Sequence, residues 1–243
     1  MSKVLLYSGG TDSWLINKLW RPDKKIYINI HGRYSEEEIK RLPNDVEIID
    51  FPFLGTIEKD NSIVPLRNLY FLMIASNYGN EICLGATKGD RGGKDKRPLF
   101  FKVTEWLINY CLNGNSYGSY GKIKICNDFY NKSKNELLEQ YLNNGGTIEE
   151  FIEETFTCYS PINNKPCYNC KPCIRKFLLG EYYNYKYSEE QENKVIDYLI
   201  KNIIPKNNNN GTYFTKRKGE GKIDKIAVDK LFKRHNLNWK DYQ

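Results

Sequence analysis

The chain has 243 residues, of which 40% are hydrophobic, so it fits one large domain or one domain with an appendage. No apolar run reaches transmembrane length and no signal peptide precedes the first strand pattern, which predicts a cytoplasmic protein that binds no membrane. The net charge of +7 is concentrated at the C-terminus, because residues 205–243 carry ten Lys or Arg against four Asp or Glu. The rest of the chain is close to neutral.

Strand and helix patterns alternate through the first two thirds of the chain. Apolar strands are expected at residues 3–7, 25–30, 46–51, 81–86 and 122–126. Helices are expected directly after residue 13, from residue 35, and over 66–78, 99–112, 134–143 and 148–154. Residues 52–62 and 87–98 are expected to form loops. This alternation predicts an α/β fold built on a doubly wound, parallel, five-stranded sheet.

Three of the helix starts carry a capping-box pattern, in which a Ser or Thr is followed three residues later by a Glu. The three pairs are Ser35 with Glu38, Ser133 with Glu136, and Thr147 with Glu150.

Two connections are expected to meet at the carboxyl edge of the sheet. The first strand is followed by the turn SGGTDS at residues 8–13, and the fourth by the polar loop 87–98. In the strand order 3-2-1-4-5 these connections are neighbours, at the place where doubly wound sheets bind ligands. We therefore expect one site formed by both. Beyond this α/β domain at 1–155 we expect a helical segment at 156–204 and a basic extension at 205–243, with a linker at 207–211 and a helix at 224–236.

The turn at residues 8–13 has the features of an anion site. A glycine turn that opens a helix aims backbone N–H groups and the helix N-terminus at one point, which suits phosphate. Adjacent glycines allow close approach of a ligand. Hydroxyl groups add further donors: Ser8, Thr11 and Ser13. The alternative is an ordinary strand-to-helix turn capped by Asp12 or Ser13.

The seven cysteines fall into two groups. Cys83, Cys111 and Cys126 are isolated in apolar contexts and are interpreted as core residues. The others are spaced C-x8-C-x2-C-x2-C: Cys158, Cys167, Cys170 and Cys173. In an intracellular chain such a cluster favours metal over disulfides, and four thiolates suit a tetrahedral structural zinc. An iron–sulfur cluster and free thiols are the alternatives.

Several segments, in order over residues 1–180, resemble one family. The turn SGGTDS resembles the loop of the PP-loop ATP pyrophosphatase superfamily. The segment VPLRN at 64–68 resembles the VPxRN element of the QueC (7-cyano-7-deazaguanine synthase) family, and DKRPLF at 95–100 resembles its DCRPxF segment. Residues 156–175 resemble its four-cysteine zinc segment.

The resemblance implies an AMP-forming carbon–nitrogen ligase of queuosine biosynthesis that acts as a homodimer. Its substrates would be 7-carboxy-7-deazaguanine, ammonia and ATP with Mg²⁺. Two adenylations would give first an amide and then the nitrile, 7-cyano-7-deazaguanine, with release of AMP and pyrophosphate. The cysteines would hold a structural zinc ion, and residues 1–155 would be the nucleotide-binding domain.

The resemblance also implies roles for individual residues. The turn would bind the phosphates through Ser8, Gly9, Gly10, Thr11, Asp12 and Ser13. Within it, Asp12 would hold magnesium or cap the loop. Arg67 and Asn68 would contact nucleotide or substrate; their alternative is a surface helix start. In the substrate-facing loop, Gly85 matches the family glycine, Asp90 and Asp95 would read the N–H edge of the base or bind magnesium, and Arg97 would hold the substrate carboxylate. Lys134 would reach a phosphate, unless it is merely solvated.

The chain departs from the family pattern at a few positions. Trp14 replaces a Thr, Lys96 replaces the cysteine of DCRPxF, and Tyr168 replaces a glycine between zinc ligands. These departures and the basic extension leave two alternatives open: a QueC-like ligase that joins a related carboxylate to an amine on a protein or nucleic acid, or a nucleotide-binding module without catalysis. The extension itself either binds nucleic acid or packs as a helix on the body.

Overall fold

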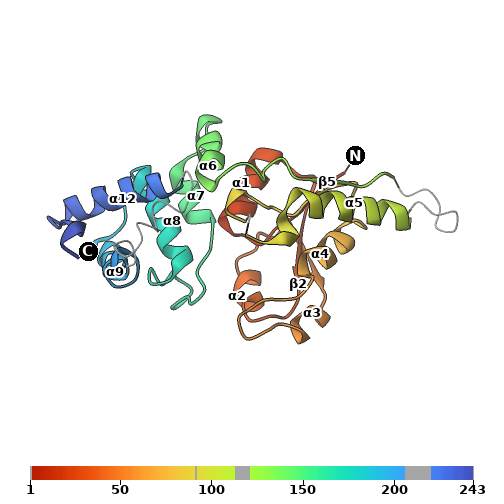
Figure 1. Ribbon diagram of the computed structural model, residues 1–243, viewed down its shortest axis with the longest axis horizontal. Helices are drawn as coiled ribbons and strands as arrows, with labels where there is room; N and C mark the ends of the chain where they lie inside the picture. Colours follow the sequence, from red (N-terminus) through yellow and green to blue (C-terminus); the bar gives the residue numbers. More distant parts are fainter. Residues whose placement is uncertain (1, 91, 113–120, 206–219, 243) are drawn as a thin grey trace. The chain divides into compact units, whose positions relative to one another are not determined.

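The computed structural model describes residues 2–90, 92–112, 121–205 and 220–242 (Figure 1). The chain forms two compact units, one up to Leu137 and the other from Leu138 onward. The domain boundaries expected at 155 and 204 stay predictions, and the linker expected at 207–211 lies outside the described residues. Within the described part of the chain, no helix is both long and apolar enough to cross a bilayer.

The first unit is built on a parallel sheet in the order β3-β2-β1-β4-β5, as predicted. Its strands are β1 (Lys3–Leu6), β2 (Lys24–Asn29), β3 (Val46–Asp50), β4 (Glu81–Cys83) and β5 (Lys124–Cys126). Residues on both faces of the central strand are fully buried, since Val4 and Leu5 are adjacent and neither contacts solvent. This burial is typical of a parallel sheet that helices cover on both sides.

The helices of the first unit are α1 (Thr11–Trp20), α2 (Ser35–Ile39), α3 (Phe53–Thr56), α4 (Arg67–Ala75) and α5 (Pro98–Leu112). Leu72 of α4 and Phe101 of α5 join the sheet residues in one core cluster. Trp14 of α1 is only 2% exposed, and Lys18 lies 4.8 Å from the centre of its ring. This departure from the family pattern is therefore a core residue.

The prediction of a structureless loop at 52–62 was wrong, because α3 lies within it. Leu54 is fully buried in the core cluster, and a Cβ at Gly55 would lie 2.1 Å from the Ile30 carbonyl oxygen. Tertiary packing thus orders a helix too short to show a periodic pattern. The loop 87–98 similarly contains two short 3-10 turns, η1 (Lys88–Asp90) and η2 (Lys94–Lys96).

Two of the three capping boxes are confirmed and one was wrong. Ser133 with Glu136 and Thr147 with Glu150 exchange the expected hydrogen bonds. At α2 the Ser35 hydroxyl instead accepts from the N–H of Gly32 at 3.0 Å. Glu38 accepts from the Tyr27 hydroxyl at 2.7 Å, because the crossover from β2 brings the two side chains together.

The second unit is helical. It contains most of α6 (Lys134–Asn143), then α7 (Ile148–Glu154), α8 (Lys171–Tyr182), α9 (Glu189–Tyr198), η3 (Leu199–Ile203), α12 (Glu220–Arg234) and η4 (Trp239–Tyr242). The helix expected at 224–236 is α12, and it packs on α8 and α9 through a core that includes Phe177, Val195 and Leu231. For the described part of the basic extension, packing on this unit is therefore confirmed.

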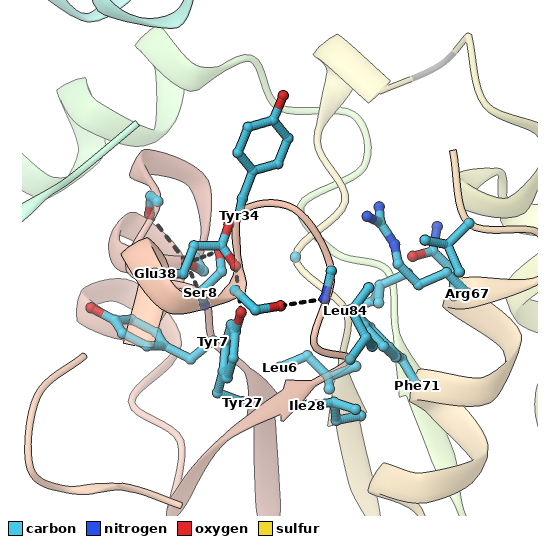
Figure 2. Close-up of a pocket in the computed structure, with 18 of the residues that line it drawn as sticks. Leu6, Tyr7, Ser8, Tyr27, Ile28, Tyr34, Glu38, Arg67, Phe71 and Leu84 are labelled. Carbon is cyan, nitrogen blue, oxygen red and sulfur yellow. Dashed lines mark hydrogen bonds between the residues drawn. The ribbon is translucent and has the colours of Figure 1, made fainter. Parts of the chain in front are cut away.

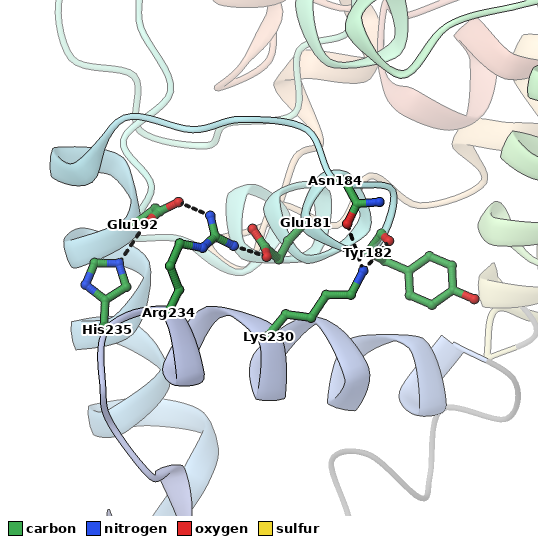
Figure 3. Close-up of polar contacts among 7 residues, drawn as sticks. All are labelled: Glu181, Tyr182, Asn184, Glu192, Lys230, Arg234 and His235. Atoms are coloured by element: carbon green, nitrogen blue, oxygen red, sulfur yellow. Dashed lines mark hydrogen bonds and ion pairs between the residues drawn. The ribbon is translucent and has the colours of Figure 1, made fainter.

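Buried charges join α12 to the rest of the second unit (Figure 3). Arg234 forms ion pairs with Glu181 of α8 and with Glu192 of α9, and His235 contacts Glu192 at 2.6 Å. Lys230 donates to the Tyr182 carbonyl oxygen and to Asn184, each at 3.0 Å. Burial raises the pKa of Glu181 above its usual range, although Arg234 opposes the shift.

Candidate functional site

A cavity of about 320 Å³ lies in the first unit where β1, β2 and β4 end (Figure 2). The turn after β1 lines it together with two sets of residues. One set comes from β2 and α2 and includes Tyr27, Ile28 and Glu38. The other comes from α4 and the loop after β4 and includes Arg67, Asn68, Gly85, Asp90 and Lys96. The two connections expected to form one site therefore do line one cavity.

The turn between β1 and α1 leaves the start of α1 open. Gly9 has a φ of +71°, which disfavours any residue with a Cβ. Gly10 is the N-cap of α1 and no side chain caps the helix, so neither Asp12 nor Ser13 does. The Ser13 hydroxyl turns back to the Gly10 carbonyl oxygen at 3.1 Å. An uncapped helix N-terminus that faces a cavity is suited to an anion.

Asp12 is only half satisfied within the described residues. Its Oδ2 lies 3.3 Å from the Lys134 ammonium, whereas its Oδ1 is buried and has no hydrogen-bond partner. An unsatisfied buried polar atom costs about 1–3 kcal/mol. Because Asp12 lines the cavity, a bound ligand or cation can supply the missing partner. A carboxylate oxygen is a ligand that Mg²⁺ prefers, so the donor fits that ion.

The loop after β4 presents an ion pair to the cavity. Lys96 lies 2.7 Å from Asp90 Oδ1, and Asp90 Oδ2 accepts from the N–H and hydroxyl of Thr87 at 3.0 and 3.2 Å. Burial alone raises the pKa of Asp90, but Lys96 and the Thr87 hydrogen bonds outweigh it and hold the pKa below its usual range. Asp90 is thus ionised and fixed in place. Behind it, buried Asn68 donates to Asp95 at 2.7 Å.

Four cysteines of the second unit converge on one point. The Sγ atoms of Cys158, Cys167, Cys170 and Cys173 all lie within 4.8 Å of one another. The N–H of Cys167 donates to Cys158 Sγ, and the N–H of Asn169 donates to Cys167 Sγ, each at 3.3 Å. Such hydrogen bonds stabilise thiolates. A tetrahedron with metal–sulfur bonds of about 2.3 Å has sulfur–sulfur edges of about 3.8 Å, so the cluster is close to the size that a single ion requires.

The thiols have unequal proton affinities. A hydrogen bond from Cys173 lowers the pKa of Cys170 to about 5, whereas burial raises the pKa of Cys167 to about 11. The same cluster raises the pKa of Cys173. Crowded thiols that share protons in this way are stabilised when a cation replaces the protons.

The sequence comparisons agree with this geometry. The family model of the queuosine biosynthesis protein QueC matches residues 52–178, which is more than half of the chain. The chain belongs to the QueC family. The matched region covers the loop after β4 and all four cysteines of the cluster.

Several relatives of this chain carry the same name. A 7-cyano-7-deazaguanine synthase of Leptospira interrogans is 34% identical over 124 residues, 48% of each chain. The chain thus spans about half the length of that relative. Synthases of the same name from Bacteroides fragilis and Phocaeicola vulgatus are 27 and 24% identical. Those matches cover 74 and 77% of this chain and 95 and 97% of the relatives.

The structure brings together most of the residues that the QueC motifs single out. Those that line the cavity are Ser8, Gly10, Asp12, Ser13, Arg67, Asn68, Gly85 and Asp90. Gly9, Thr11, Asp95, Arg97 and Lys134 are outside its lining. Thr11 is buried in α1, Lys134 touches the site through Asp12, Asp95 touches it through Asn68, and Arg97 is exposed.

The motifs miss several polar residues of the cavity, among them Lys96, Tyr27 and Glu38. Lys96 stands where the QueC motif has a cysteine, and it lines the cavity beside Asp90. Tyr27 of β2 and Glu38 of α2 also line the cavity (Figure 2). Burial raises the pKa of Glu38, while the Tyr27 hydrogen bond and Arg67 oppose the shift. The sequence signal of Glu38 was a capping pattern, which predicted a local role and not a place in the cavity.

The QueC-family glycine that Tyr168 replaces has a structural explanation. Tyr168 has a φ of +51°, in the left-handed region that favours glycine. Its ring packs edge-on against Phe177, and its hydroxyl accepts from Gln191 of α9 at 3.0 Å. These contacts compensate for the backbone conformation.

Proposed function

We propose that this QueC-family chain is an ATP-dependent ligase that converts 7-carboxy-7-deazaguanine and ammonia to 7-cyano-7-deazaguanine. The observation that carries the proposal is the single cavity lined by both the SGGTDS turn and the loop after β4. Family membership and the shared name of the relatives support the substrate.

ATP would bind with its phosphates at the uncapped start of α1. Gly10, Ser8 and Ser13 line that end of the cavity and offer backbone and hydroxyl donors. Bound Mg²⁺ would neutralise phosphate charge, and Asp12 Oδ1 is the buried oxygen that would contact it directly or through water. Lys134 would keep Asp12 oriented through its contact with Oδ2.

The reaction would proceed by two adenylations. The substrate carboxylate attacks the α-phosphorus of ATP, the bond to the β-phosphate oxygen breaks, and pyrophosphate leaves. Ammonia then attacks the acyl carbon of the adenylate, loses a proton and displaces AMP to leave the primary amide. The amide oxygen attacks a second ATP in the same way. Loss of AMP, which carries that oxygen away, and of the nitrogen-bound protons gives the nitrile. Positioning and charge stabilisation are the main requirements.

The ion pair of Lys96 and Asp90 would recognise the substrate. A 6-oxo deazapurine presents a carbonyl acceptor next to an N–H donor, and the pair offers an ammonium donor next to a carboxylate acceptor. Lys96 is also the better placed cation for an anionic substrate, because it lines the cavity and exposed Arg97 does not. Asp95 would act through Asn68, and Arg67 would contact the nucleotide.

The four cysteines would hold a structural zinc ion. All four positions of a tetrahedral ion would be filled by sulfur, which leaves no site for substrate or water. An iron–sulfur cluster would place its thiolates on different iron atoms and spread them further apart than a single ion does.

A second candidate is a QueC-like ligase that joins a related carboxylate to a different amine. The observation in its favour is the Lys96 side chain itself, which changes the charge of the substrate-facing wall relative to the family's cysteine.

One assay separates these candidates. The zinc-loaded protein is incubated with ATP, Mg²⁺, ammonium and 7-carboxy-7-deazaguanine, and nitrile, amide and pyrophosphate are measured by mass spectrometry. Nitrile with two pyrophosphates per product is expected. Pyrophosphate only with another carboxylate or amine supports the second candidate. ATP binding without pyrophosphate from any carboxylate contradicts both. An Asp12→Asn variant is assayed in parallel, and its matched control is Asp23→Asn, because Asp23 lies outside the cavity lining and accepts a hydrogen bond from the N–H of Lys3.

A further inference from the structure

Glu38 is a carboxylate of the cavity that has no role in the reaction proposed above. Its Oε2 accepts from the Tyr27 hydroxyl at 2.7 Å, and both residues line the cavity (Figure 2). Its Oε1 has no hydrogen-bond partner among the described residues. A carboxylate that lines a cavity and has only one of its oxygens engaged can accept a strong hydrogen bond from a ligand.

The register of the sheet places this carboxylate near the turn at residues 8–13. Leu6 of β1 pairs with Ile26 of β2, and the N–H of the next residue, Tyr7, donates to the Ile26 carbonyl oxygen at 2.8 Å. Tyr27 therefore lies beside Tyr7, one residue before the turn begins. Because neighbouring strands are about 4.8 Å apart, Tyr27 holds Glu38 roughly one strand away from the turn.

The Tyr27 side chain is itself held in place. It is 6% exposed, and burial together with the nearby Glu38 carboxylate raises the pKa of its hydroxyl well above the ordinary value. The hydroxyl therefore stays protonated and donates to Glu38. This hydrogen bond orients the carboxylate before any ligand binds, which lowers the entropy that binding must cost.

The ribose is the part of ATP that suits this position. A single methylene group joins it to the α-phosphate, so phosphates bound at the start of α1 keep the ribose close to the turn. The loop after β4, on the other side of the turn, carries the ion pair of Lys96 and Asp90 assigned to the substrate. The neighbouring strand that remains is β2, which α2 follows.

Hydrogen-bond chemistry also favours the ribose. The triphosphate offers a carboxylate no donor, whereas the ribose offers two hydroxyls. In dinucleotide-binding sheets an acidic residue beyond the glycine turn accepts from a ribose hydroxyl in this way. We propose that Glu38 accepts a hydrogen bond from a ribose hydroxyl of the nucleotide and that Tyr27 is its positioning residue. This inference rests on the ATP binding of the proposed function.

The test compares the dissociation constants of ATP, 2′-deoxy-ATP and 3′-deoxy-ATP for the full chain. Isothermal titration calorimetry measures them with Mg²⁺ present and the carboxylate substrate absent, so the result reports nucleotide binding alone. We expect the wild type to bind at least one deoxy analogue on the order of 10-fold more weakly than ATP. Glu38→Met keeps the length of the side chain but has no oxygen, and it should bind all three nucleotides with nearly equal affinity.

A second variant and a matched control accompany this one. Tyr27→Phe keeps the carboxylate but removes the hydrogen bond that orients it, so the preference for ATP should fall part of the way. Glu36→Met makes the same replacement at an exposed residue of α2 outside the cavity lining, and it should keep the wild-type preference. The preference is a ratio within one protein, so a loss of stability that leaves the protein folded does not alter it.

The outcomes separate this inference from the proposed function. Equal affinities of the wild type for the three nucleotides overturn the role of Glu38 and leave the ligase proposal to the pyrophosphate assay. A wild-type preference that persists in Glu38→Met overturns it as well. A wild type that binds none of the three overturns both proposals. A preference for ATP that Glu38→Met removes supports the role of Glu38 even if no carboxylate yields pyrophosphate.

Discussion

Each unit of this molecule contains a carboxylate with one paired and one unpaired oxygen. In the first unit Asp12 pairs with Lys134 through one oxygen, and in the second Glu181 pairs with Arg234. The other oxygen of each is buried without a hydrogen-bond partner among the described residues. The two carboxylates differ in what surrounds them. Asp12 lines the cavity, whereas Glu181 is packed in the helical unit with only 2% of its side chain exposed.

This comparison separates a proposed ligand site from a structural ion pair. Asp12 lines the cavity, so a bound ligand or cation can supply the partner that its buried oxygen lacks. Glu181 does not line that cavity, and burial raises the pKa of the group. An unsatisfied buried atom thus points to function only where a cavity adjoins it.

The largest expected effect is on activity. Asp12→Asn removes a charge from the cavity but keeps the volume and one oxygen. We expect pyrophosphate release to fall at least on the order of 1,000-fold, because magnesium and phosphate positioning are lost. The midpoint of thermal unfolding should change little, since a costly buried charge is removed along with its pair to Lys134. A variant that keeps wild-type turnover would contradict the role of Asp12.

Removal of the metal is expected to have the next largest effect, and only in the second unit. Cys173→Ser, or treatment with a strong chelator, leaves crowded thiols without a cation and should destabilise the unit by several kcal/mol, on the order of a structural zinc site. Hydrogen exchange measured by mass spectrometry should rise in peptides of α8 and α9. Peptides of β1 and β4 are the internal control and should keep their protection.

Arg234→Met tests the second half of the comparison. It leaves Glu181 without its cation and Glu192 with only His235. Loss of one partner of a buried pair costs about 3–5 kcal/mol, and because Arg234 is itself 45% exposed we expect about 2 kcal/mol. Urea denaturation measures this loss. Adding Glu181→Gln should restore part of it, and a double variant less stable than the single one would contradict the assignment.

The smallest expected effect is on the pH dependence of stability. The folded-state pKa of Glu181 is raised, so the folded state binds the proton more tightly than the unfolded state does. This contribution to stability is absent well above the raised pKa and appears as the pH falls through it. Relative to Glu181→Gln, the wild type should therefore gain stability, by less than about 1 kcal/mol, between pH 7 and pH 5. Urea midpoints of both proteins measure the difference.

Sequence patterns correctly predicted the features that depend on residues close together in the chain. The glycine turn, the alternation of strands and helices, two capping boxes and the four-cysteine spacing each involve residues close in sequence. The strand order 3-2-1-4-5 was taken from the doubly wound fold class, and the sheet has that order. Predictions were wrong where tertiary contacts override local pattern. Glu38 bonds Tyr27 across a crossover instead of capping its own helix, and α3 exists because Leu54 is buried.

The cavity was only partly predictable for the same reason. The sequence showed Lys96 as a departure from the family's DCRPxF segment. Its position beside Asp90 depends on the short turn η2, which no hydrophobic periodicity predicts. Arg97 and Asp95 adjoin Lys96 in sequence, yet only Lys96 lines the cavity, because successive residues of a 3-10 turn point in different directions.

Tyr168 has a consequence for cooperativity. A glycine between two metal ligands would give the loop freedom and no side-chain contact, whereas Tyr168 joins the loop to Gln191 of α9 and to Phe177 of α8. The ordering of the metal loop and the docking of α9 are thereby thermodynamically linked. Any interaction that holds α9 in place, including the ion pair of Arg234 with Glu192, would therefore raise the affinity of the four-cysteine loop for the proposed metal ion.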